Sequence, residues 1–167
     1  GLTLYAKWDA SKDTKYTVEH YQQTLAETDT AGYELAGSDM LTGTTGQPTT
    51  AAAKVYIGFT ARPFEQAVIA ADGSTVVKIY YDRDAYNVSW NVNGGTELTG
   101  DYTDGNVKFG TPVVKPADPS RIGYVFDGWY TDSECTNTLV KDATVPVGGL
   151  TLYAKWTPSS STKYTVK

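Results

Sequence analysis

The chain has 167 residues, a net charge of −5 and a pI near 4.8, without a cluster of basic residues. This balance argues against nucleic acid as a partner, and no apolar run reaches the roughly 18 residues that membrane insertion needs. One cysteine and one histidine cannot form an internal disulfide or a zinc site. The 13 tyrosines and 4 tryptophans favour β-strands over helices.

The first half of the chain predicts a small module between two boundaries. Residues 1–8 (GLTLYAKW) alternate like a strand, and residues 9–14 form a polar linker. The module spans 15–84 and contains four strand-like stretches: KYTVEHY, GYELAGSDMLTG, GFTARPFEQAVIA and STVVKIYYDRD. PTTAAAKVY, at 48–56, predicts the one short helix of the chain.

A second module is predicted over 85–156. In YNVSWNVNGG the apolar Tyr86, Val88 and Trp90 alternate with polar residues, and Asn93-Gly94 begins a tight turn. The three prolines of TPVVKPADPSRIG predict an extended connection, because proline interrupts both helices and central strands. GYVFDGWY and GLTLYAKW (149–156) are the remaining strands, and a polar linker follows at 157–167.

Two phrases recur at one spacing. GLTLYAKW occupies 1–8 and 149–156, TKYTV occupies 14–18 and 162–166, and 149 − 1 = 162 − 14 = 148. Ser11 and Ser159 agree at the same spacing. The pattern indicates a tandem array with a unit of 148 residues. Residues 1–8 are then the last strand of the preceding repeat, separated from its core, and 157–167 lead into the next repeat.

The second module resembles the Listeria–Bacteroides repeat, the B-repeat of internalin-type surface proteins. The resemblance is carried over 86–156 by YNVSWNVNGG, VKPADPSRIGYVFDGWYTD and LTLYAKW. The stretch CTNTLVKDATVPVGG departs from the family pattern. The first module resembles a MucBP-type (mucin-binding-protein) repeat over 15–84, through YTVEHYQQ, GTTG, YIGFTARPF and DGSTVVKIYYDRD.

These resemblances imply a mainly β (α+β) fold of two ubiquitin-like β-grasp modules in tandem. In such a sheet the first and last strands lie side by side and parallel, so the chain enters and leaves a module at opposite ends. The resemblances also imply an extracellular protein of the Gram-positive bacterial surface, attached to the cell wall, whose partners include neighbouring repeats.

Catalysis finds no support in the sequence, so we expect no enzyme, no cofactor and no metal site. His20 lies on the apolar face of a strand and is expected in the core, and Cys135 is expected to be inert. The acidic groups 82–84 and 101–106 lack the ligand spacing of a calcium loop and are interpreted as solvated turns. Trp8, Trp90, Trp129 and Trp156 are expected to pack in cores.

Two functions remain open. The first is an extended stalk or spacer that projects another domain from the cell. The second is an adhesive module that binds host mucin glycans or a host surface protein. Tyr21, Tyr80 and Tyr153 are predicted to face outward from their strands and are the candidate ligand-binding residues.

Overall fold

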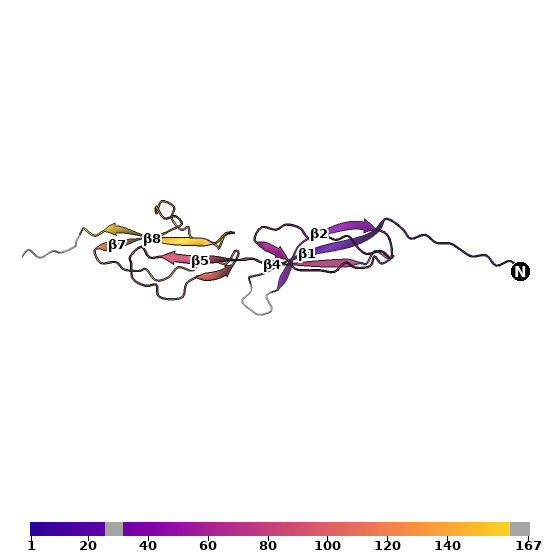
Figure 1. The fold of residues 1–167 in the computed structure, drawn as a ribbon, viewed down its shortest axis with the longest axis horizontal. Coiled ribbons are helices and arrows are strands. Elements are labelled where there is room, and N and C mark those ends of the chain that lie inside the picture. Colours follow the sequence, from indigo (N-terminus) through magenta and orange to yellow (C-terminus); the bar gives the residue numbers. More distant parts are fainter. Residues whose placement is uncertain (26–31, 161–167) are drawn as a thin grey trace, which may run out of the picture. The chain divides into compact units, whose positions relative to one another are not determined.

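The computed structural model describes residues 1–25 and 32–160. Packing within the chain divides it into two compact units, Gly1–Arg83 and Asp84–Lys167. Each unit is built around one four-stranded mixed sheet (Figure 1).

The sheet of the first unit has the strand order β2-β1-β4-β3. Its strands are β1 (Thr14–Gln23), β2 (Tyr33–Gly43), β3 (Phe59–Ala61) and β4 (Val76–Arg83). The first strand, β1, pairs antiparallel with β2 and parallel with the last strand, β4. The parallel pair occupies the centre, so the chain enters this unit at one end of the sheet and leaves it at the other.

One face of this sheet carries the core. Alternate residues of the two central strands are almost fully buried, as the period of a strand requires: Tyr16, Val18, His20, Val77, Ile79 and Tyr81. The segment between β2 and β4 covers this face with Ala51 and Ile69. The predicted core position of His20 is therefore confirmed.

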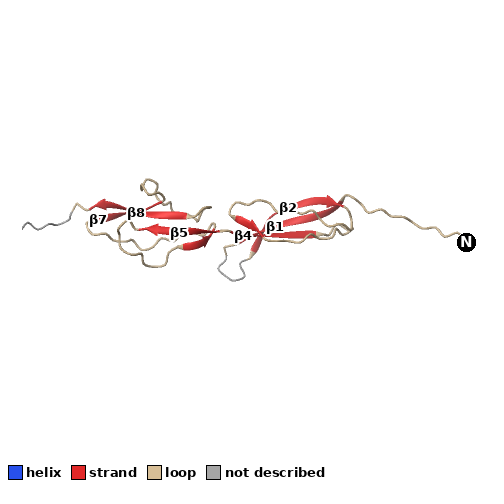
Figure 2. Ribbon diagram, viewed as in Figure 1, coloured by secondary structure: helices blue, strands red, loops and turns tan. Residues whose placement is uncertain are grey.

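The helix predicted at 48–56 is wrong. The described residues contain strands and loops but no helix (Figure 2), so the fold is mainly β and the helical part of the predicted α+β class is absent from them. The backbone amides of this segment are used elsewhere: Thr49 N–H donates to the carbonyl of Ala67 at 2.7 Å, and Ala51 N–H donates to Gln66 Oε1 at 2.9 Å. These bonds hold the segment extended across the sheet and leave its amides unavailable for a helix.

The sheet of the second unit repeats the same plan in the order β6-β5-β8-β7. Its strands are β5 (Ala85–Asn91), β6 (Gly105–Lys108), β7 (Tyr124–Tyr130) and β8 (Leu150–Pro158). The predicted parallel pairing of the first and last strands is confirmed in this unit, because β8 lies beside β5 and runs parallel to it. The short strand β6 begins within the acidic group 101–106, so the interpretation of that group as a solvated turn is wrong at its end.

Tryptophans dominate the core of the second unit. Trp129 is 4% exposed, and the rings of Trp90 and Trp129 meet edge to face with centroids 4.8 Å apart. Trp156 packs at the margin of the same cluster, and its indole N–H donates to the carbonyl of Val92 at 2.9 Å. The prediction that Trp90, Trp129 and Trp156 pack in a core is confirmed.

The two copies of the octapeptide have different environments. In the second copy, Leu152 and Ala154 of β8 are buried in the core. In the first copy, residues 1–8 lie outside any strand, and Leu2, Leu4 and Trp8 are 88%, 83% and 89% exposed. The expectation that Trp8 packs in a core is therefore wrong, and no surface of the described residues covers it.

The glycine that opens the octapeptide tests how tightly β8 is seated. Gly149 has a φ of +85°, and a Cβ there would lie 2.3 Å from the carbonyl oxygen of Asn87 on β5. Gly148 has a φ of +88° but open space around its Cβ position. Gly148→Ala is expected to cost about 1–2 kcal/mol of unfolding free energy, the usual cost of a left-handed non-glycine residue.

Gly149→Ala is expected to cost clearly more, because the clash with a backbone atom must also separate β5 from β8. Urea unfolding of the two variants measures the difference, with Gly148→Ala as the matched control. Equal destabilisation by the two substitutions would contradict this account of the close approach.

Candidate functional site

Three tyrosines gather on the face of the first sheet that is turned away from its core. Tyr21 of β1 and Tyr80 of β4 are register partners, and their rings stack with centroids 5.3 Å apart and planes 25° apart. Tyr33 of β2 meets Tyr80 edge to face at 5.0 Å. All three rings are half-buried. We call Tyr21, Tyr33 and Tyr80 the tyrosine cluster.

Charged side chains enclose the tyrosine cluster. The Nζ of Lys78 lies 5.6 Å from the ring centroid of Tyr21, and the guanidinium of Arg62 lies 5.2 Å from that of Tyr33. Cations at this distance from a ring face are attracted by its quadrupole. Arg62 also donates through Nε to Asp82 at 2.8 Å. The ring positions are therefore held by neighbouring charges as well as by stacking.

The phenol groups of the cluster donate to carboxylates. Tyr21 OH donates to Glu19 Oε2 at 2.7 Å, and this bond raises the pKa of Tyr21. Burial, followed by the hydrogen bond to Asp82, raises the pKa of Tyr33 to about 12. Both phenols therefore stay protonated near neutral pH. The cluster offers aromatic faces with carboxylates and cations at the edge, a composition that suits stacking against a sugar or another ring.

The three predicted ligand-binding residues do not form one group. Tyr21 and Tyr80 lie together, whereas Tyr153 belongs to β8 of the second unit, where its register partners are Asn91 and Tyr130. Tyr33, which reaches Tyr80 from β2, was not among the predicted residues. Its alternation within GYELAGSDMLTG was visible, but a bulge opposite His20 and Tyr21 changes the register of β2.

The buried His20 belongs to a polar network on the core face of the first sheet. His20 is 0% exposed, its Nδ1 lies 2.7 Å from Tyr81 OH, and its Nε2 lies 3.1 Å from Asp39 Oδ2. Lys54 completes the network through its backbone amide to Tyr81 OH at 2.8 Å and through its Nζ to Asp39 at 2.7 Å. Lys54 and His20 both lower the pKa of Asp39. The network connects β1, β2 and β4 to the segment that covers the core, and it holds these parts of the fold together.

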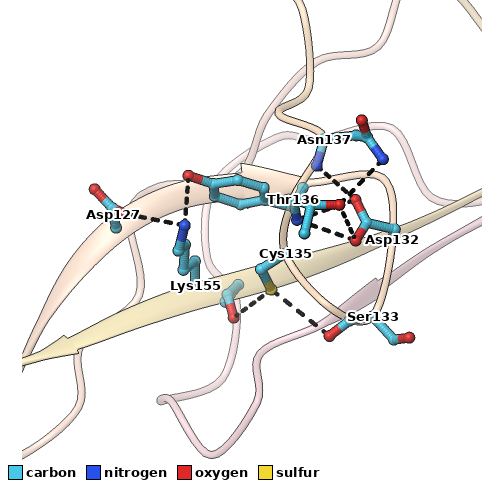
Figure 3. Close-up of polar contacts among 9 residues, drawn as sticks. Asp127, Asp132, Ser133, Cys135, Thr136, Asn137 and Lys155 are labelled. Carbon is cyan, nitrogen blue, oxygen red and sulfur yellow. Dashed lines mark hydrogen bonds and ion pairs between the residues drawn. The ribbon is translucent and has the colours of Figure 1, made fainter.

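In the second unit, the loop after β7 folds around one carboxylate (Figure 3). Asp132 accepts the backbone amides of Thr136 at 3.0 Å and of Asn137 at 2.6 Å, and it also accepts Thr136 Oγ1. These bonds lower the pKa of Asp132, the amide of Thr136 making the largest contribution. These hydrogen bonds hold the loop around the Asp132 carboxylate.

Cys135 sits inside this loop as a partly buried thiol. Its Sγ lies 3.8 Å from the carbonyl of Ser133 and 4.0 Å from that of Ala154 (Figure 3). Burial and the nearby Asp132 raise the pKa of the thiol, which disfavours the nucleophilic thiolate. The cation beside it is already engaged, because Lys155 Nζ lies 4.6 Å from the centroid of Tyr130 and 3.8 Å from Asp127.

A shallow hollow marks the end of the second unit from which the chain leaves. It encloses about 450 Å³ and is lined by Gly94, Gly95, Thr96, Ser120, Arg121, Ile122 and Tyr124. Arg121 is held over the Tyr124 ring at 4.1 Å and donates to the carbonyl of Asn93 at 3.0 Å. Within residues 1–25 and 32–160, Arg121 has no carboxylate at ion-pair distance.

Comparison with known proteins finds a family similarity for the second unit. Residues 86–155 match the family model of the Listeria–Bacteroides repeat domain. That domain is typical of surface proteins, and the second unit is similar to it over these residues. The match leaves the first unit outside its bounds.

Two proteins of Evansella cellulosilytica are similar to this chain. One, named "Putative membrane protein", is 26% identical over 162 residues, covering 93% of this chain and 22% of its own length. The other, named "Putative Gly-rich membrane protein", is 28% identical over 93 residues, covering 56% of this chain and 10% of its own length. The chain thus spans about a fifth or less of these relatives. Within the described residues, no helix has the length and hydropathy to cross a membrane.

The Asp132 loop predicts a pH dependence with a definite sign. Its folded-state pKa lies below the ordinary 3.8, so the carboxylate contributes its full stabilisation above that value and loses it as the pH falls through the folded pKa. Asp132→Ala is expected to speed hydrogen exchange at the amides of Thr136 and Asn137 at neutral pH. NMR titration and exchange measure both effects, and Asp101→Ala, at an exposed position, is the control.

A folded-state pKa for Asp132 at or above 3.8 would contradict this assignment. Unchanged exchange at Thr136 and Asn137 in Asp132→Ala would contradict it as well. Either result would mean that the loop is ordered by its other contacts.

Proposed function

We propose that the chain is a non-catalytic segment of a tandem-repeat protein on a bacterial cell surface, where it acts as a stalk that projects another domain. The observation that carries this proposal is the octapeptide repeated at 148 residues, whose second copy is the core strand β8 of a Listeria–Bacteroides repeat module. A strand phrase that recurs with the module it completes is the signature of an array.

The topology of each unit supports a spacer. The first and last strands are parallel neighbours, so the chain enters and leaves at opposite ends, and each added unit adds length. We propose that both units are β-grasp modules without the helix, and that the first is of the MucBP type. Attachment to the cell wall belongs to the same proposal.

Display on cells tests the stalk. An epitope tag is placed at the distal end of arrays with increasing numbers of 148-residue units, expressed in the organism that encodes the chain. Antibody access to the tag on intact cells is expected to rise with the number of units, because the tag clears the envelope. Access that is independent of unit number, at equal total expression, would refute the spacer function.

The tyrosine cluster favours an adhesive module as a second candidate function. Three half-buried rings with carboxylates and cations around them form the kind of face on which sugar rings stack. The proposed ligands are host mucin glycans or a host surface protein. This function is compatible with a stalk, since repeated units would present the cluster many times.

A glycan array tests this second candidate with the purified chain. Tyr21→Ala with Tyr80→Ala is expected to abolish binding while the thermal midpoint changes little, because the rings lie on the face opposite the core. Tyr153→Ala in the second unit is the matched control and is expected to retain binding. If the parent chain bound neither glycans nor mucin, the spacer would remain as the proposed function.

A further inference from the structure

In the proposed array, each end of the described chain would hold one half of the junction between successive repeats. Ser11 precedes the first unit, and Ser159, at the equivalent position 148 residues later, follows the second. The carbonyl of Ser11 accepts a hydrogen bond from the amide of Thr45 at 2.8 Å. The amide of Ser159 donates to the carbonyl of Gly123 at 2.8 Å.

One serine position therefore bonds forward into the unit after it and backward into the unit before it. Because the N–H and the C=O belong to one residue, both bonds can form at the same junction. The oxygen of Gly123 and the amide nitrogen of the following Thr45 would then lie no more than about 9 Å apart. At this separation the side chains that flank the two atoms are within reach of one another.

The carbonyl of Gly123 and the amide of Thr45 each lie in a tight turn. Tyr124 N–H donates to the carbonyl of Arg121 at 3.0 Å, which closes a turn with Ile122 at its tip. Gln47 N–H donates to the carbonyl of Thr44 at 3.0 Å, which closes a turn that includes Thr45. A turn at the end of one unit would thus face a turn at the start of the next.

The side chains of the Arg121–Tyr124 turn are exposed in a way that is typical of a surface made for a contact. Ile122 is 99% exposed, an unusual state for a large aliphatic residue placed beside a hollow. Arg121 is immobilised on Tyr124 although it lacks an acidic partner within the described residues. The Thr44–Gln47 turn offers backbone and amide oxygens that suit this guanidinium.

We propose that the end of the second unit of each repeat docks directly on the start of the first unit of the next repeat. The serine at the junction hydrogen-bonds to both units, and the side chain of Ile122 is covered at the contact. The occupant is a copy of the chain's own first unit, seated through its Thr44–Gln47 turn. The inference rests on the proposed tandem array. It assigns a fixed joint to the position of the predicted polar linker.

Chain length supports the joint independently. β8 continues through Pro158, and the equivalent of the first residue of β1, Thr14, is residue 162. The three intervening residues can span at most about 14 Å between the flanking Cα atoms. A unit attached by so short a connection has little room to move away from the turn at Ile122.

A two-repeat chain tests the joint. Ser160 of one copy is followed directly by Asp13 of a second copy, which keeps the spacing of 148 residues. With Cys135→Ser throughout, spin labels are attached at Lys108→Cys in the first copy and Thr42→Cys in the second. Pulsed electron-spin distance measurement is expected to give one narrow distribution across the junction.

Ile122→Asp in the first copy is expected to abolish the narrow peak, because a carboxylate would be buried in the contact. In the single 167-residue chain the same substitution is expected to leave thermal unfolding unchanged, since Ile122 is 99% exposed there. The control is Val140→Asp, at a valine that is 66% exposed and follows the bridge of Thr138 to Tyr130, at the other end of β7 from Tyr124. This control is expected to retain the narrow peak.

A broad distribution in the parent two-repeat chain would overturn the joint, as would a narrow peak that survives Ile122→Asp. Neither result bears on whether an array displays a tag on cells, which antibody access measures separately. Conversely, a narrow, Ile122-dependent peak together with tag access that ignores unit number would keep the joint and refute the stalk.

Discussion

The parallel pairing of the first and last strands is the interaction on which each unit depends. β1 with β4, and β5 with β8, form the centre of their sheets, and the other strands pair only at the outer edges. Such a pair joins residues far apart in sequence, so the connecting segment must cross the sheet. Here that segment is extended, pinned by individual hydrogen bonds and side chains, and it buries the core that a helix would otherwise cover.

The octapeptide GLTLYAKW follows from the same constraint. Gly149 permits a backbone approach to Asn87 that a Cβ would prevent, Leu152 and Ala154 fill the core, and Trp156 closes its margin. In residues 1–8 the same letters form no strand, because no β5 and β7 flank them. The phrase is therefore a strand only in the presence of its sheet.

The side chains of Cys135 and His20 are engaged in contacts within their own units. The thiol of Cys135 is shifted away from reactivity, and His20 holds strands together from a fully buried position. The features that face outward are an aromatic cluster on one sheet and a turn with Ile122 at the end of the other unit. One suits a ligand and the other a neighbouring repeat, and they lie on different units, so a stalk and an adhesive surface need not compete for the same residues.

Much of the strand pattern and of the core was determined by local sequence. Period-two alternation identified most of the strands, the burial of His20 and the core packing of Trp90, Trp129 and Trp156, because these signals depend on neighbouring residues. The strand β6 and the extended course of 48–56 were not predictable, since partners distant in sequence hold them in place. The tyrosine cluster likewise required tertiary structure: Tyr21 meets Tyr80 only through the β1–β4 register, and Tyr33 joins them through a bulge. Sequence determined which residues face outward, and long-range strand pairing decided which of them meet.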